Sequence, residues 1–267
     1  MSFKNVLTAE ILKTKRTYIL TASILLPLIV TGLTCAMNIA FFNAVKDVGM
    51  NPWTSLCLFS FPCYGFLYPM LVFLIGFRLN DIEYKSSGFK HLFVLPVPKT
   101  YFYYSKALIL IFCLFVSLLI GLSLILIGGK LCSIFYPFMQ FQDYTIKSLI
   151  IAFFVKLFFF SLSIIAIQLL LSLYFNNAIK SIGIPLILLI IGTLMGGWEY
   201  NYLFPYSYPF QASSSFRSGE GFFIGKTFYW SMLYSVFFLL WELWLYGCSG
   251  CIASKASPQP SPKEREH

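Results

Sequence analysis

Long apolar runs of about 20 residues recur along this chain and constrain its fold more than any other feature. A helix of that length and composition is long enough to cross the hydrocarbon core of a bilayer. The chain has 267 residues, of which 58% are hydrophobic and only 11% are charged. A soluble domain carries about twice that charged fraction. We therefore predict an all-α membrane protein that crosses the bilayer repeatedly.

Six runs of this kind predict six transmembrane helices, at residues 18–42, 56–77, 107–129, 148–175, 182–198 and 227–247. We place them in a single transmembrane domain that covers residues 1–253. Residues 254–267 are rich in Pro, Ser and charge, a composition typical of disordered segments. They are expected to form a cytoplasmic tail.

Residues 2–16 predict a further helix that lies on the membrane surface. Apolar residues recur there at helical spacing, beside basic residues that would face anionic headgroups: Phe3, Val6, Leu7 and Ile11. A cleaved signal peptide is the alternative, but the apolar run that follows is too long for one. With the N-terminus inside, most of the 19 Lys and Arg residues fall on the cytoplasmic side. We expect a multi-pass protein of the cytoplasmic membrane with both termini inside.

Residues 83–106 form the one long polar and basic interruption of the apolar sequence. The residues that cannot lie comfortably in hydrocarbon are Glu83, Lys85, Lys90, His91, Lys99 and Lys106. A helix over residues 87–95 would place Phe89, Leu92 and Phe93 on one face. Pro96 and Pro98 would end it, because proline lacks an N–H and disfavours helical geometry in the residue before it. We predict a short cytoplasmic helix between spans two and three that docks on a soluble partner.

The sequence contains no residue pattern typical of catalysis. Its two histidines, His91 and His267, are too few for an H-E-x-x-H zinc site. Gly128-Gly129-Lys130 lacks the first glycine and the Ser or Thr of a Walker A loop. The seven cysteines lie mostly in apolar runs and do not form a disulfide framework. We predict that the chain is not an enzyme and binds no metal, cofactor or nucleic acid.

Cys248 and Cys251 have the C-x-x-C spacing, which is a weak metal or redox signal. Two small buried thiols at the end of a span explain the pair more simply.

Two ionisable residues lie inside predicted spans, where a charge is costly. Glu242 could face the interior of the bundle and contact a cationic substrate or Lys156, or it could lie near the cytoplasmic interface. Lys156 could extend its amine toward the interface if the fourth span begins near Leu157.

Aromatic residues alternate along residues 200–210, at Tyr200, Tyr202, Phe204, Tyr206, Tyr208 and Phe210. This period does not fit a helix, and Pro205 and Pro209 exclude a central strand. We predict an extended segment in the outer interface, a depth that tyrosine prefers. It would act either as an anchor or as an outer gate that contacts substrate through Tyr202 and Tyr206.

Residues 83–106 resemble the cytoplasmic loop of type-2 ABC transporter permeases. Those loops carry an acidic residue, an apolar helix, a Leu-Pro-Val or Leu-Pro-Ile step and a Ser-Lys pair, which correspond here to Glu83, residues 89–95, Leu95-Pro96-Val97 and Ser105-Lys106. Within that family, the lantibiotic self-immunity permeases are similar at Glu83, Lys85, Lys90, His91, Leu92, Leu95, Pro96 and Pro98. Residues 9–19 and the segment with Pro205 and Pro209 are also similar to that subgroup.

The resemblance implies the permease subunit of an ATP-binding cassette exporter, paired with a second permease subunit that is identical or homologous. A separate cytoplasmic ABC ATPase would bind ATP and Mg²⁺ and dock at Glu83, Phe89, Lys90, His91, Leu92, Phe93, Leu95 and Pro96. The implied cargo is hydrophobic or amphipathic, for example an antimicrobial peptide such as a lantibiotic, whose removal gives self-protection or resistance. A non-transporting sensor or assembly factor that docks a soluble partner through residues 83–106 stays open as the alternative.

Overall fold

The computed structural model describes residues 3–15, 17–41, 51–85, 99–137, 141, 147–175, 177–218 and 225–247. Every regular element in these ranges is a helix, so the predicted all-α class is confirmed. The longer helices are α1 (Phe3–Lys15), α2 (Ile19–Ala40), α4 (Pro52–Lys85), α6 (Lys99–Phe135), α7 (Lys147–Tyr174), α8 (Ala178–Leu194), α9 (Tyr208–Ser218) and α10 (Lys226–Gly247). Between α8 and α9 lie the short 3₁₀ helices η3 (Met195–Gly197), η4 (Asn201–Leu203) and η5 (Pro205–Ser207).

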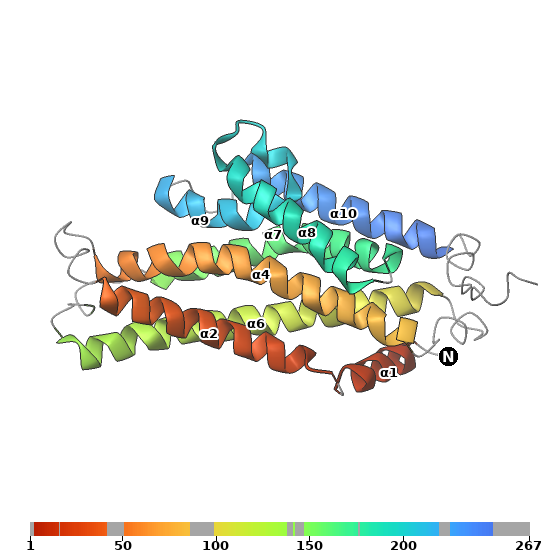
Figure 1. Cartoon of the computed structure of the whole chain (residues 1–267), viewed down its shortest axis with the longest axis horizontal. Helices are drawn as coiled ribbons and strands as arrows, with labels where there is room; N and C mark the ends of the chain where they lie inside the picture. The colour runs from red at the N-terminus through yellow and green to blue at the C-terminus, as the bar shows by residue number, and fades with distance from the viewer. Residues whose placement is uncertain are drawn as a thin grey trace, which may run out of the picture.

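The four helices α2, α4, α6 and α7 lie lengthwise beside one another and form the body of the bundle (Figure 1). Helices α2 and α6 run in one direction, and α4 and α7 run in the other. Helices α8 and α10 lie obliquely on one side of this bundle, and α1 lies across the end at which α2 and α6 begin. We refer to that end as the α1 end and to the other as the opposite end.

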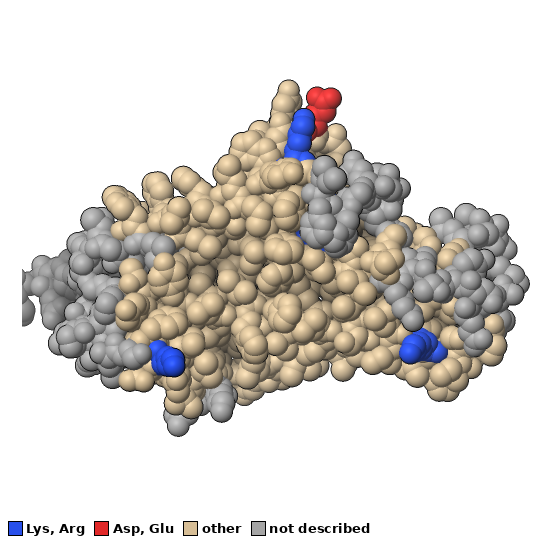
Figure 2. Space-filling model, turned by 180° about the vertical axis from the view of Figure 1, so that it is seen from behind, with Lys and Arg blue, Asp and Glu red and all other residues tan. Residues whose placement is uncertain are grey.

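Within the described residues, five helices are long and apolar enough to cross a membrane: α2, α4, α6, α7 and α8. Helix α10 covers the sixth predicted run but is not among these five. On the face seen in Figure 2, the visible Lys and Arg side chains lie mainly toward the two ends of the bundle and on the crest formed near η3 and η4. The flank between them is almost free of charge, as a surface in contact with hydrocarbon requires.

Helices α4 and α6 are longer than the predicted spans 56–77 and 107–129. With 34 and 37 residues, they are about 51 and 56 Å long at 1.5 Å per residue. Both exceed the roughly 30 Å of a hydrocarbon core. Much of the predicted polar interruption therefore continues these helices, because α4 runs to Lys85 and α6 begins at Lys99. The helix predicted over residues 87–95 lies outside the described residues.

Two buried tyrosines, one helical turn apart on α4, attach this helix to its neighbours. The Tyr64 hydroxyl lies 2.8 Å from Thr31 Oγ1 and donates to the Pro27 carbonyl of α2 at 3.3 Å. The Tyr68 hydroxyl donates to the Leu114 carbonyl of α6 at 2.7 Å. Both rings are fully buried. Because hydrocarbon offers no partner for a hydroxyl, these bonds favour one arrangement of the three helices.

Gln168 joins three helices at a gap in the hydrogen bonding of α8. Pro185 has no N–H to donate to the Ser181 carbonyl one turn earlier. The Gln168 amide of α7 donates to that carbonyl at 3.2 Å and to the Phe73 carbonyl of α4 at 3.3 Å. A side chain far away in the sequence thus supplies the donor that proline removed from α8.

We expect Gln168→Leu to destabilise the bundle, because it leaves the Ser181 carbonyl unpaired, at a cost of about 1–3 kcal/mol. The measurement is the thermal unfolding of detergent-purified protein. Pro185→Ala is the matched background, since an alanine at this position would restore an N–H for the Ser181 carbonyl. Gln168→Leu should therefore cost about 1 kcal/mol less in that background. Equal losses in the two backgrounds would contradict the pairing of the amide with the proline gap.

The prediction of an extended segment over residues 200–210 is wrong. The chain forms η4 and η5 and then enters α9 at Tyr208. Pro205 is the first residue of η5, a position where its missing N–H has no consequence. The two prolines therefore begin helical turns here instead of interrupting a strand.

A polar junction and an outer hairpin as candidate functional sites

A buried chain of hydrogen bonds joins α4, α6 and α7 near the α1 end. Lys106 Nζ donates to Asn80 Oδ1 at 2.6 Å, and Asn80 Nδ2 donates to Ser172 Oγ at 2.5 Å. Ser172 in turn donates to the Leu169 carbonyl of its own helix at 2.8 Å. Lys106 is only 2% exposed and Asn80 only 1%. We call these three residues, Lys106, Asn80 and Ser172, the polar junction.

The polar junction holds the two helices on either side of residues 86–98. Asn80 lies in the last turns of α4, and Lys106 lies in the second turn of α6. Asp81, the residue after Asn80, is also buried, and its carboxylate accepts from Arg78 at 3.4 Å. A buried ammonium requires hydrogen-bond partners to offset its desolvation. The sequence prediction treated Lys106 as part of a polar loop and did not single out Asn80 or Ser172.

Helix α1 is attached at the same end through its packing on α6. Its buried face consists of Val6, Glu10 and Thr14, and Glu10 accepts from Lys13 at 2.5 Å. The Phe3 ring meets the Tyr101 ring edge-on, with centroids 5.6 Å apart. The sequence placed Ile11 on the apolar face, yet Ile11 is 41% exposed. The face that contacts the bundle therefore includes a carboxylate, which a count of apolar positions does not reveal.

We expect Lys106→Met to destabilise the protein by about 1–3 kcal/mol, because Asn80 Oδ1 would lose its buried donor. Lys180→Met on α8 is the matched control, since Lys180 is exposed. Thermal unfolding of the two purified variants beside the wild type checks the prediction. Similar small effects of both changes would mean that the amine of Lys106 contributes no more than its aliphatic stem.

The segment from α8 to α9 folds back on itself as an outer hairpin, which we define as residues 192–211. Gln211 donates to the side chain of Asn201, to its carbonyl at 3.3 Å and to Ser207 Oγ at 2.7 Å. Ser207 Oγ also donates to the Asn201 carbonyl at 2.9 Å. Thr227 Oγ1 at the start of α10 donates to Gln211 Oε1 at 2.9 Å. These bonds hold the turn as a folded unit.

Gly192 allows α8 and the backbone of η5 to meet. A Cβ atom on Gly192 would lie 2.8 Å from the Tyr206 carbonyl carbon, closer than a real Cβ approaches backbone. A glycine is therefore required for this contact. The residues that Gly192 meets are distant in the sequence and become neighbours only in the folded hairpin.

The two tyrosines predicted to contact substrate differ in their surroundings. Tyr206 is 3% exposed, and the centroid of its ring lies 6.2 Å from that of Phe73 and 5.9 Å from that of Phe204. Burial raises the pKa of the Tyr206 hydroxyl above its ordinary value, so the ring stays neutral. Tyr202 is half-buried, and the centroid of its ring lies 6.2 Å from that of Trp230. Lys226 Nζ lies 5.7 Å from the same Tyr202 centroid. The structure thus leaves Tyr202 as the accessible member of the pair.

The other predicted site residues are placed only in part. Glu83 belongs to α4 and Glu242 to α10, but their side chains lie outside the described residues. Phe89, Lys90, His91, Leu92, Phe93, Leu95 and Pro96 also lie outside them. Lys156 is half-buried on α7, with its amine 5.6 Å from the Phe160 ring centroid. Helix α7 begins at Lys147, next to the predicted start of the fourth span at residue 148.

Comparison with known families decides the broad class of the protein. Residues 6–192 match the family described as ABC-2 family transporter protein, which is well over half of the chain. The chain belongs to the ABC-2 transporter family. No curated protein and no solved structure matched.

ABC-2 permeases are membrane transport components that work in a complex with an ATPase subunit. The matched residues include most of α1, the polar junction and both helices that flank residues 86–98. Tyr202, Tyr206 and Glu242 lie beyond the matched region. The family assignment therefore covers the polar junction and leaves most of the outer hairpin unassigned.

Proposed function

We propose that this chain is the permease subunit of an ABC exporter that removes a hydrophobic or amphipathic peptide from the membrane. The match of residues 6–192 to the ABC-2 transporter family carries the proposal. The resemblance of residues 83–98 to the lantibiotic self-immunity permeases supports an antimicrobial peptide as cargo. The subunit would pair with a second permease subunit, identical or homologous, and with cytoplasmic ATPase subunits.

The proposed topology has six spans, with α10 as the sixth and the α1 end in the cytoplasm. Helix α10 packs along α7 and ends on the same side as α1, which supports an even number of crossings (Figure 1). The helix segments at the α1 end carry Lys4, Lys13, Arg78, Lys106 and Lys180. Positive charge is concentrated in the cytoplasmic loops of membrane proteins. This orientation places residues 86–98 in the cytoplasm, where a soluble ATPase can reach them.

In the proposed coupling, an amphipathic helix over residues 87–95 docks against the ATPase. The polar junction supports a mechanical role, because it bonds the end of α4 to the start of α6 and to α7. A displacement of residues 86–98 would therefore move three helices together. Helix α1, which packs on α6, would be displaced with them.

The decisive experiment is co-purification of the permease with its ATPase, comparing Leu92→Asp with Val94→Asp. Leu92 lies on the predicted apolar face, and Val94 lies about 200° around the same helix. A carboxylate on a buried apolar face costs more than the roughly 1.5–3 kcal/mol that burial of a leucine contributes. We expect Leu92→Asp to abolish complex formation and coupled ATPase activity, while Val94→Asp retains both.

Normal membrane insertion of both variants is the control for folding. A Leu92→Asp subunit that binds the ATPase as tightly as the wild type would contradict the coupling role of this face.

The outer hairpin is the proposed cargo contact. Its crest exposes large aromatic side chains, including Trp198 at 50% and Tyr200 at 51%. Aromatic faces bury large apolar areas and attract cations, each contact contributing about 0.5–2 kcal/mol. The amine of Lys226 already lies over Tyr202, which shows that this ring can accept a cationic neighbour.

We expect Tyr202→Ala to weaken the peptide stimulation of ATPase activity severalfold while basal activity is retained. Tyr202→Phe keeps the ring and should retain the response. Tyr206→Ala is the structural control, because the loss of a buried ring should lower thermal stability by about 3–5 kcal/mol. Peptide titrations of the reconstituted complex provide the measurement. An unchanged half-maximal peptide concentration in Tyr202→Ala would limit this residue to an anchoring role.

A further inference from the structure

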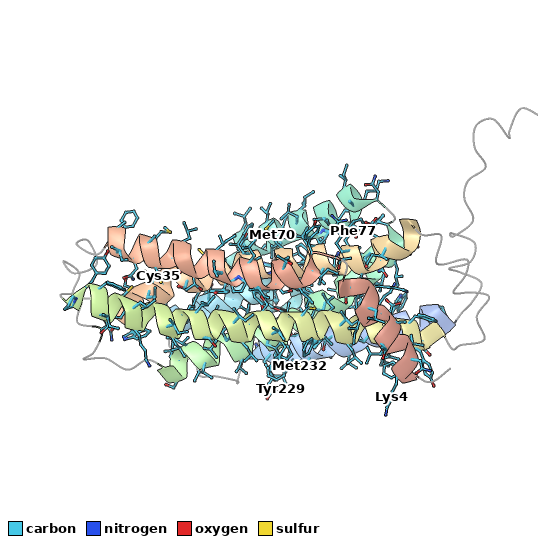
Figure 3. The ribbon with its side chains drawn as sticks, turned by 90° about the horizontal axis from the view of Figure 1, so that it is seen from below. Lys4, Cys35, Met70, Phe77, Tyr229 and Met232 are labelled. Atoms are coloured by element: carbon cyan, nitrogen blue, oxygen red, sulfur yellow. The ribbon has the colours of Figure 1, made fainter. Side chains whose placement is uncertain are left out.

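Two cysteines from neighbouring helices lie together toward the opposite end of the bundle. Cys35 is in the last turns of α2, which ends at Ala40, and Cys132 is in the last turn of α6, which ends at Phe135. The two helices run side by side in the same direction, and Figure 3 shows Cys35 toward the end of α2. Neither residue belongs to the polar junction or to the outer hairpin.

Cys132 lies next to Cys35 across the interface of α2 and α6. Cys35 Sγ also lies over Gly128, where an added Cβ atom would be 2.9 Å from the sulfur. The same added atom would be 3.7 Å from Thr31 Cγ2. Thr31 and Cys35 are one turn apart on α2, and Gly128 and Cys132 are one turn apart on α6. The facing surfaces therefore match over a full helical turn, and glycine allows the close approach.

Two neighbouring thiols can form a disulfide or bind a soft metal ion. Among the described residues, no group of three or more His, Cys, Asp or Glu side chains could hold a metal ion. A disulfide needs only two sulfurs whose Cβ atoms approach to roughly 3.5–4.5 Å. Because Cys35 Sγ lies over Gly128, one helical turn from Cys132, a short movement brings the two sulfurs to this geometry. Both cysteines are free in the structure, so it represents the reduced state.

We propose that Cys35 and Cys132 form a reversible dithiol–disulfide site that links α2 to α6. The oxidant is a small-molecule disulfide that can partition into the membrane. Cys35, which is half-buried, attacks one sulfur of the oxidant, loses its proton and forms a mixed disulfide as the first thiol is released. Cys132, which is buried, then attacks the Cys35 sulfur, loses its proton and releases the second thiol. The oxidant gains the two electrons and two protons that the pair loses.

The remaining described cysteines lack this arrangement. Cys57 and Cys113 are buried, and Cys63 is half-buried. None of their sulfurs is among the nearest atoms to a described glycine, as Cys35 Sγ is to Gly128. They therefore serve as internal controls for the selectivity of the reaction.

The test treats membranes that contain the full-length protein with 4,4′-dithiodipyridine, blocks remaining thiols by alkylation and analyses unreduced peptides by mass spectrometry. We expect one linked species that joins the peptide of Cys35 to the peptide of Cys132, two hydrogens lighter than their sum. Dithiothreitol should return both peptides to the thiol form. Cys57 and Cys113 should be recovered as alkylated thiols after denaturation.

Two variants test the order of the steps. Cys132→Ser should trap the pyridylthio adduct on Cys35, because the resolving thiol is missing. Cys35→Ser should leave Cys132 largely unreacted at the same time point, because Cys132 is buried. The proposal is overturned if the wild type accumulates the adduct on Cys35 without the link, or if Cys132 reacts as fast in Cys35→Ser as in the wild type. Neither readout depends on transport, so the outcome is independent of the proposed function.

Discussion

A polar group buried between these helices can find a hydrogen-bond partner only inside the protein, because hydrocarbon supplies none. This requirement explains the contacts that join the bundle. Tyr64 and Tyr68 bond to α2 and α6, and Gln168 fills the gap that Pro185 leaves in α8. Apolar side chains alone would contribute little selectivity, since lipid tails are as apolar as leucine. The polar bonds therefore select one helix arrangement among many of similar apolar contact.

The α1 end of the bundle and the outer hairpin use such bonds differently. At the α1 end, Lys106 and Asn80 bond adjacent helices where residues 86–98 leave and re-enter the bundle. At the outer hairpin, Asn201 and Gln211 bond a compact turn to itself and to the start of α10. The first arrangement is suited to transmitting a displacement to several helices together. The second is suited to presenting aromatic side chains on a fixed support.

Some features of this fold follow from consecutive residues, and others depend on contacts between residues far apart in the sequence. The apolar runs overlap the helices of the structure, but the second run ends before Arg78 and the third begins after Lys106, so both helices were predicted too short. Nothing in the sequence pairs Asn80 with Lys106. In the fold they satisfy each other and are buried. The alternating aromatics of residues 200–210 suggested an extended chain. The bonds between Asn201 and Gln211, ten residues apart, instead accompany short helical turns that no period of two could indicate.

The sequence by itself determined that the chain is helical and membrane-spanning, because the length and apolarity of a run are properties of consecutive residues. The sequence also located the polar interruption, residues 83–106, which carries the family resemblance. Only the tertiary structure decided that Glu10 and Lys106 are buried, that Tyr206 is covered while Tyr202 is accessible, and that Cys35 meets Cys132. Each of these depends on which faces of distant helices meet, and side-chain packing between helices sets those faces.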